Sequence, residues 1–118
     1  MTTQQVADKM SVLFKENKWD LIQNELFAEN CISIEPDNSM ALKLAEGLPA
    51  IKEKGKQFNA QIEEMHGGYV GDLIVGGNFI SCAMGMDVTM KGMGRVKFDE
   101  IAVYEVKDGK IVKEQFFF

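Results

Sequence analysis

Two amphipathic helices are predicted at the start of the chain from the spacing of its apolar residues. In the first, apolar positions recur at intervals of three and four residues: Val6, Met10, Leu13 and Phe14. A polar break follows at residues 16–18, where Asn17 is a candidate N-cap for a second helix. The buried stripe expected for that helix consists of Trp19, Ile22 and Leu26. Because this spacing places the apolar side chains on one face of each helix, we expect both helices to pack against a common core.

A short strand and a third helix are predicted next. Residues 31–35 (CISIE) are rich in β-branched side chains and are followed by Pro36, which ends the strand. Ser39 is expected to cap a short helical turn that reaches Leu44. Pro49 suits the first turn of a long helix. The inner face expected for that helix consists of Ile51, Gly55, Phe58 and Ile62.

From about residue 63 the apolar pattern changes to the alternation that is typical of strands. Eight of the eleven glycines lie between Gly67 and Gly94, which favours turns and bulges over helix. Strands are expected at 63–75, 78–90 and 95–106, and Asp108-Gly109 is a strong hairpin signal before a last strand. The chain is therefore expected to be an α+β domain, with three helices followed by a four-stranded antiparallel meander.

Composition and charge exclude several classes of function. The 118 residues are 46% hydrophobic and carry a net charge of −5 without a basic cluster, which argues against nucleic-acid binding. No apolar run is long enough to cross a membrane, and the polar start MTTQQ is unlike a signal peptide, so we expect a cytoplasmic protein. Cys31 and Cys82 are expected to be buried free thiols. No metal site and no nucleotide-binding motif is recognisable, so no cofactor is expected.

Several segments resemble the SnoaL-like branch of the nuclear transport factor 2-like (ketosteroid isomerase-like) superfamily. They are the end of the paired helices LFAEN, the strand ISIEP, the helix GLPAIKEKGKQF and the closing hairpin DEIAVYEVKDGKIVKEQFFF. The resemblance covers nearly the whole chain and implies a single SnoaL-like domain over residues 1–118. It also implies a cystatin-like cone, in which three N-terminal helices pack on a curved, mainly antiparallel sheet around a pocket. Many members form homodimers through the outer face of the sheet.

Acidic side chains are expected inside this cone. In the strand 95–106, alternation places Glu100 and Tyr104 on the more apolar face, which is the expected core face. Pairing through the Asp108-Gly109 turn would bring Glu114 onto the same inner face as Tyr104. Buried carboxyls need partners, and a shared proton would raise at least one carboxyl pKa towards neutrality. Such a group can act as an acid or a base.

Glu35 is the first candidate for the catalytic base. Pro36 holds it in an extended conformation. In ketosteroid isomerases, which this segment resembles, the proton-abstracting carboxylate precedes a proline, and here a glutamate replaces the aspartate. The alternative is that Glu35 caps the turn at Asn38 or meets solvent. Ser11 stands where the isomerases place the tyrosine that stabilises the oxyanion, so steroid isomerisation by their arrangement is not expected.

Further candidates come from the remaining strands and helices. His66 precedes Gly67-Gly68, a predicted bulge, and could either shuttle protons in the pocket or be structural. Asp87 could bind ligand if its face of the strand points inward, and is otherwise a solvated strand residue. Three aromatic residues complete the candidate ligand-binding set together with Asp87 and Glu114: Trp19, Phe58 and Phe116.

The opposite face of the predicted sheet is also partly apolar. Its expected members are Ile101, Val103, Ile111 and Phe117. A homodimer formed through this outer face would cover them. The methionines of the strand 78–90 are expected in the core, and the series Lys52, Lys54 and Lys56 is expected on a solvated helix face.

Different classes of function remain open at this point. If the chain is an enzyme, we expect cofactor-free acid–base chemistry of the isomerase, cyclase or dehydratase type on a small apolar or partly polar organic molecule. Glu35 would be the base, and Tyr104, His66 or protonated Glu100 would stabilise the oxyanion. The alternative is a non-catalytic module that binds a small ligand or only dimerises.

Overall fold

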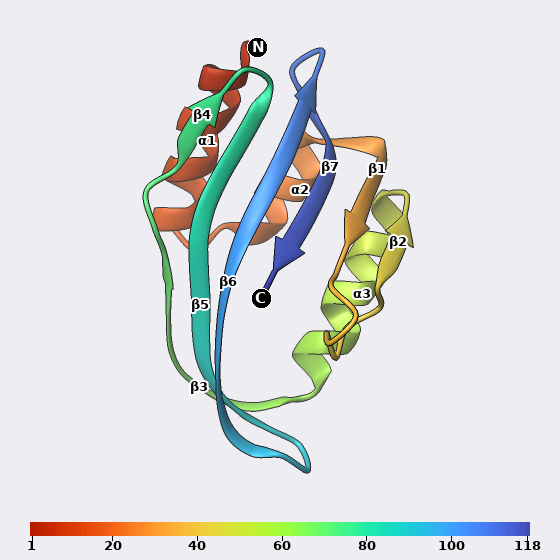
Figure 1. Cartoon of the computed structure of the whole chain (residues 1–118), viewed down its shortest axis with the longest axis vertical. Helices are drawn as coiled ribbons and strands as arrows, with labels where there is room; N and C mark the ends of the chain where they lie inside the picture. The colour runs from red at the N-terminus through yellow and green to blue at the C-terminus, as the bar shows by residue number, and fades with distance from the viewer.

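Three helices pack on one side of a bent, seven-stranded open sheet in the computed structural model, which describes residues 1–118 (Figure 1). The helices are α1 (Thr3–Lys15), α2 (Trp19–Leu26) and α3 (Leu48–Ala60). The strands are β1 (Phe27–Ile34), β2 (Leu44–Glu46), β3 (Ile62–Val70), β4 (Ile74–Gly76), β5 (Phe79–Met90), β6 (Gly94–Lys107) and β7 (Lys110–Phe117). None of the helices combines the length and the apolar character that a membrane span requires.

The sheet order is β2-β1-β7-β6-β5-β3, with β4 paired to β5. All neighbours are antiparallel except β1 and β7, which run parallel. In Figure 1, the long strands β5 and β6 curve along the molecule, with α1 beside β4 and β5 and α3 beside β1 and β2. The predicted α+β class, with three helices on a curved and mainly antiparallel sheet, is confirmed.

The start of α2 differs from the prediction. Asn17 does not cap α2, because its backbone adopts a left-handed conformation (φ 57°) that closes α1. Its amide donates to the Phe14 carbonyl, and the amide of Lys18 donates to that of Leu13. Lys18 is the N-cap of α2 and makes no side-chain cap. Asparagine tolerates a positive φ better than most residues, so the residue that was expected to begin one helix ends the other.

The segment after β1 also differs from the prediction. The side chain of Ser39 accepts a hydrogen bond from the Ala41 amide (3.0 Å), but no helical turn follows. Instead Leu44 begins β2, which pairs antiparallel with the end of β1. The open edge of β1 offers unpaired backbone groups to this segment, and pairing with them replaces the short helix. The predicted strand 63–75 is likewise interrupted, and becomes β3 and β4.

The core lies between the helices and the inner face of the sheet. On β5 the buried side chains alternate, which confirms that its methionine face is core: Ile80, Cys82, Met84, Val88 and Met90. Cys31 and Cys82 are both buried and free. Ile111 was expected on the outer face but is fully buried. A register shift pairs Ile111 with Val106 and Lys113 with Glu105, so the alternation of β7 is reset after the hairpin.

Candidate functional site

A cavity of about 1460 Å³ lies between the helices and the inner face of the sheet. Its walls include aromatic and sulfur-containing side chains, several of them predicted as ligand contacts: Phe14, Trp19, Phe58, Met84, Met86, Phe98, Phe116 and Phe118. Five titratable side chains with raised pKa values also line it: Glu35, Tyr69, Glu100, Tyr104 and Glu114. The volume exceeds the roughly 300 Å³ at which small-molecule pockets begin. The interior therefore has room for a guest molecule.

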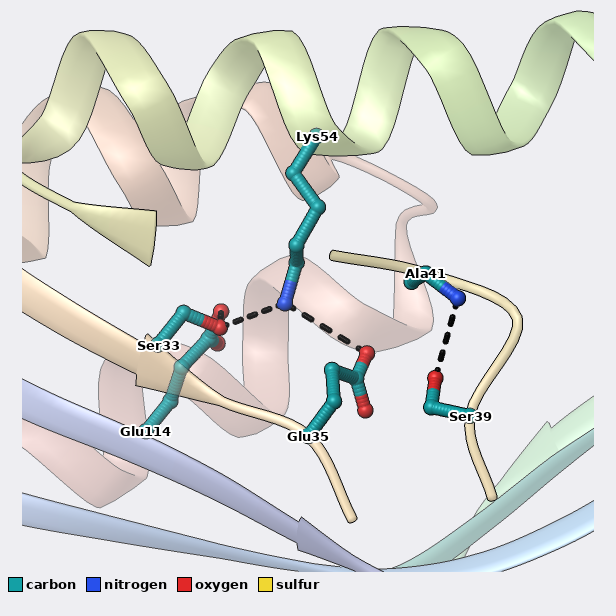
Figure 2. Close-up of polar contacts among 6 residues, drawn as sticks. All are labelled: Ser33, Glu35, Ser39, Ala41, Lys54 and Glu114. Atoms are coloured by element: carbon teal, nitrogen blue, oxygen red, sulfur yellow. Dashed lines mark hydrogen bonds and ion pairs between the residues drawn. The ribbon is translucent and has the colours of Figure 1, made fainter. Parts of the chain in front are cut away.

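Lys54 is the centre of a buried polar network (Figure 2). Its Nζ donates to Ser33 Oγ (2.6 Å) and lies 3.4 Å from Glu35 Oε1. Ser33 in turn donates to Glu114 Oε1 (2.7 Å). Figure 2 shows the lysine reaching from α3 towards the strands, with Glu35 on one side and Ser33 with Glu114 on the other. One ammonium group therefore stabilises two carboxylates, one directly and one through a serine.

The fold brings these four residues together from three elements. Ser33 of β1 lies opposite Glu114 of β7 in the parallel register. Glu35 follows the last residue of β1 directly, and Lys54 lies one turn after Ile51 on the buried face of α3. The side chain of Lys54 is only 9% exposed. The prediction of a solvated lysine series is therefore wrong for Lys54, because its position three residues after Ile51 turns it inward.

Glu35 has one satisfied and one unsatisfied oxygen. Oε1 faces Lys54, whereas Oε2 is buried and has no hydrogen-bond partner. Burial raises the pKa of Glu35, and the charge and hydrogen bond of Lys54 partly offset that rise. The alternative that Glu35 caps the following turn does not apply, since Ser39 makes that contact with Ala41. An unpartnered carboxylate oxygen inside an apolar cavity is the geometry expected of a base.

Glu100 and Tyr104 face the same cavity from β6. Burial, and next the charge of Glu35, raise the pKa of Glu100 to about 7. Burial is also the main cause that raises the pKa of Tyr104 well above 10, so its hydroxyl stays protonated. Tyr104 is paired with Glu114 across the β6–β7 hairpin. Burial raises the pKa of Glu114, and the hydrogen bond from Ser33 opposes this rise. The cavity thus holds several carboxyls whose pKa values burial raises, together with a hydroxyl that stays protonated.

His66 and Asp87 do not line the cavity. His66 lies at the predicted bulge of β3, where its Nε2 is 2.7 Å from Thr89 Oγ1. Asp87 accepts two hydrogen bonds from Arg95 (3.0 and 2.9 Å) on the face of β5 opposite buried Val88. Neither residue is therefore placed to contact a ligand in the cavity. The alternation of β5 turns Asp87, and also Thr89, the hydrogen-bond partner of His66, away from the core.

The three predicted aromatic ligand contacts all line the cavity. Trp19 packs edge-on against Phe14, with ring centroids 4.7 Å apart. Phe58 of α3 meets Phe98 of β6 in the same way at 5.9 Å. The Lys54 ammonium lies 5.3 Å from the ring centroid of Phe116. The aromatic walls thus touch the polar network directly, which gives the cavity one polar side and one apolar side.

Sequence reasoning missed Ser33, Lys54 and Phe98 as parts of this site. A signal existed for Phe98, which shares the alternating face of Glu100 on β6. A signal also existed for Lys54, at the i+3 position from Ile51. Ser33 carried none, because its role depends on the parallel pairing of β1 with β7, which joins segments 81 residues apart.

Comparison with known proteins identifies the family. The sequence profile described as SnoaL-like domain matches residues 1–118. A protein of Mesorhizobium loti, provisionally described as a SnoaL-like polyketide cyclase, is 29% identical and superposes with a TM-score of 0.92 over 100% of both chains. No curated protein matches the sequence.

Two more distant structures share the fold. A nuclear transport factor 2-like protein of Burkholderia thailandensis is 13% identical (TM-score 0.82; 99% of this chain and 90% of that one). A protein of Catenulispora acidiphila with a ketosteroid isomerase-like fold, solved with trimethylamine, is 15% identical (TM-score 0.66; 82% and 72%). At this level of identity the likeness shows the fold alone. The match of the profile over residues 1–118 shows that the chain belongs to the SnoaL-like domain family.

Proposed function

We propose that this protein catalyses cofactor-free proton transfer on a small organic molecule, in an isomerase-, cyclase- or dehydratase-type reaction. The observation that carries the proposal is the pairing of two unequal carboxyls in one cavity. Glu35 is held beside Lys54 and keeps one oxygen without a partner, whereas Glu100 has a pKa of about 7. When the surroundings of two titratable groups push their pKa values apart, one group can act as the base and the other as the acid. The family is compatible with this chemistry.

Each residue has a role that its surroundings favour. Glu35 Oε2 removes a C–H proton next to a carbonyl or similar group, and the electron pair of that bond moves towards the substrate oxygen. Protonated Glu100 and the Tyr104 hydroxyl donate hydrogen bonds to the negative charge that develops there. The proton is then returned to another atom of the substrate, or a leaving group departs. Lys54 keeps Glu35 oriented.

A chromogenic elimination tests the proposal without knowledge of the natural substrate. A base that removes the C–H proton of 5-nitrobenzisoxazole breaks its N–O bond and releases a coloured phenolate. We expect saturable turnover whose kcat/KM rises with pH as Glu35 loses its proton and falls above about pH 7 as Glu100 ionises. In Glu100→Gln the falling limb should disappear. Steady-state absorbance assays over a range of pH measure both the rising and the falling part of the kcat/KM profile.

The same assay separates the alternatives. A rate no higher than that of free acetate at equal concentration would contradict the catalytic proposal and leave a ligand-binding protein. A rate that rises through pH 7 in the wild type would show that Glu100 is itself the base, and would exclude its role as the acid.

We also propose that the outer face of the sheet forms a homodimer. Ile101 and Phe117 are paired on β6 and β7, and are 44% and 48% exposed. Phe79 of β5 lies on the same face, four residues along the strand from Ala83, which pairs with Ile101, and is exposed as well. Exposed apolar side chains gathered on one sheet face are usually covered by a partner. Sedimentation velocity at micromolar concentration should show a dimer, and Ile101→Lys should shift it to the monomer. A monomeric wild type would refute this interface.

A further inference from the structure

The acidic side chains inside the cavity outnumber the basic ones. Lys54 is the one buried ammonium, against the buried carboxyl of Glu114 and the partly buried carboxyls of Glu35 and Glu100. Ionisation of any second carboxyl therefore exceeds the one positive charge. The other charged side chains that line the opening are exposed to water, which screens them: Lys15, Asp20, Lys52, Lys56 and Asp72. Because an uncompensated charge inside an apolar cavity is costly, a bound cation would stabilise the site.

One buried polar atom in the same cavity lacks a hydrogen-bond partner. Oε2 of Glu35 is buried and accepts no hydrogen bond. A carboxylate oxygen can accept an N–H and attracts positive charge. This open position therefore favours a ligand that donates a hydrogen bond and carries positive charge.

The apolar wall of the cavity tolerates a cation. Phe116 already lies 5.3 Å from the Lys54 ammonium, and the edge-to-face pair of Phe58 and Phe98 lines the same space. Aromatic rings attract ammonium groups through their negative faces, while their area buries the carbon skeleton of a ligand. The cavity therefore combines an acidic side for a charged group with an aromatic side for an apolar one.

We propose that this cavity binds an organic ammonium ion, an amine in its protonated form that carries an apolar body. Its N–H donates to Oε2 of Glu35, its charge lies close to Glu100, and its apolar part packs against Phe58, Phe98 and Phe116. Because it occupies the Glu35 oxygen that removes the substrate proton and favours ionised Glu100, the ion is a ligand that competes with the substrate of the proposed function. Its binding does not depend on turnover.

Binding should be coupled to the protonation of Glu100. The titratable groups that face Glu100 come from α3 and from several strands: Glu35, Lys54, Tyr69, Cys82, Tyr104 and Glu114. A second cation among them favours the ionised carboxylate, so binding expels a proton. Since the pKa of free Glu100 is about 7, the affinity for the cation should be greater at pH 8 than at pH 6.

Three probes with the same phenyl group and different charge test this inference: 2-phenylethylammonium, 2-phenylethanol and phenylacetate. Titration calorimetry at pH 6 and pH 8 measures their affinities, and Trp19, the only tryptophan, lines the cavity as a fluorescent reporter. We expect the ammonium ion to bind about tenfold more tightly than the alcohol at pH 8, and phenylacetate to bind most weakly. The affinity for the ammonium ion should fall about tenfold at pH 6, whereas that for the alcohol should not change.

Glu100→Gln serves as the matched variant. It should lose most of the pH dependence of ammonium binding and keep the affinity for 2-phenylethanol. Equal affinities for the ammonium ion and the alcohol at pH 8, or tighter binding of phenylacetate, would overturn the inference. If 5-nitrobenzisoxazole is turned over while the ammonium ion binds no better than the alcohol, the proposed function stands and the ligand class is wrong. Preferential binding of the ammonium ion without turnover supports the ligand class and removes the catalytic proposal.

Discussion

Replacing Glu35 by glutamine is expected to slow the elimination of 5-nitrobenzisoxazole by about a hundredfold or more. The amide keeps the shape of the side chain and can still accept a hydrogen bond from Lys54, but it cannot take up a proton. Glu35 carries the one buried side-chain oxygen without a partner in the structure, so no other carboxylate offers the same free acceptor. Steady-state rates of wild type and Glu35→Gln at pH 7 measure the effect.

Two further variants make this result specific to Glu35. Glu53→Gln makes the same chemical change on the exposed side of α3, where the carboxylate contacts only Gln57 (3.3 Å), and should leave the rate unchanged. Glu35→Asp keeps the carboxylate but shortens its reach by one methylene, and should retain part of the rate. Wild-type turnover in Glu35→Gln would show that Glu35 is not the base. Thermal unfolding of each variant excludes a loss of fold as the cause.

The inward-facing positions of Glu100, Tyr104 and Glu114 could be predicted because they depend only on strand alternation and a hairpin. Alternation is a local rule, and the Asp108-Gly109 turn fixes which residues of β6 and β7 face each other. The same rule failed at Ile111, where a register shift resets the alternation of β7 by one position. Alternation also left the orientation of Asp87 open, since both faces of β5 carry small and apolar residues.

The polar network could not be predicted because it depends on contacts between distant segments. Ser33 contacts Glu114 only through the parallel pairing of β1 and β7, which no turn motif in the sequence indicates. Lys54 was interpreted as one member of a solvated series, because Lys52 and Lys56 two positions to either side are indeed exposed. A lysine is buried only where a carboxylate compensates its charge, and that partner, Glu35, lies on another element.

Replacing Lys54 by methionine is expected to lower the free energy of unfolding by about 3–5 kcal/mol at pH 8. Methionine fills a similar volume, so the loss does not come from a cavity. It comes from Glu35 and Glu114, which keep their burial but lose the ammonium group that faces them. Urea denaturation of wild type and Lys54→Met, followed by circular dichroism, measures the difference.

The size of this loss should depend on pH, with a sign that the structure determines. Burial already raises the pKa of Glu35 and of Glu114 above 4.5, whereas Lys54 lowers both. Without Lys54 these folded-state pKa values rise further above those of the unfolded chain. Below the unfolded pKa both states are protonated and the variant loses least. As the pH rises through the folded pKa values, the two carboxyls must ionise without a counter-charge, so the destabilisation should increase from pH 5 to pH 8.

Two control variants test whether the loss of stability comes from the missing counter-charge of the buried carboxylates. Lys56→Met makes the same change at an exposed position of α3 and should alter stability by less than about 0.5 kcal/mol. Combining Lys54→Met with Glu35→Gln removes one of the two carboxylates that are left without a counter-charge. The double variant should therefore recover part of the stability that Lys54→Met loses. If Lys54→Met were as mild as Lys56→Met, or if its effect were the same at pH 5 and pH 8, the lysine would not compensate the buried carboxylates. The structure would then give no physical reason why Glu35 acts as the base and Glu100 as the acid.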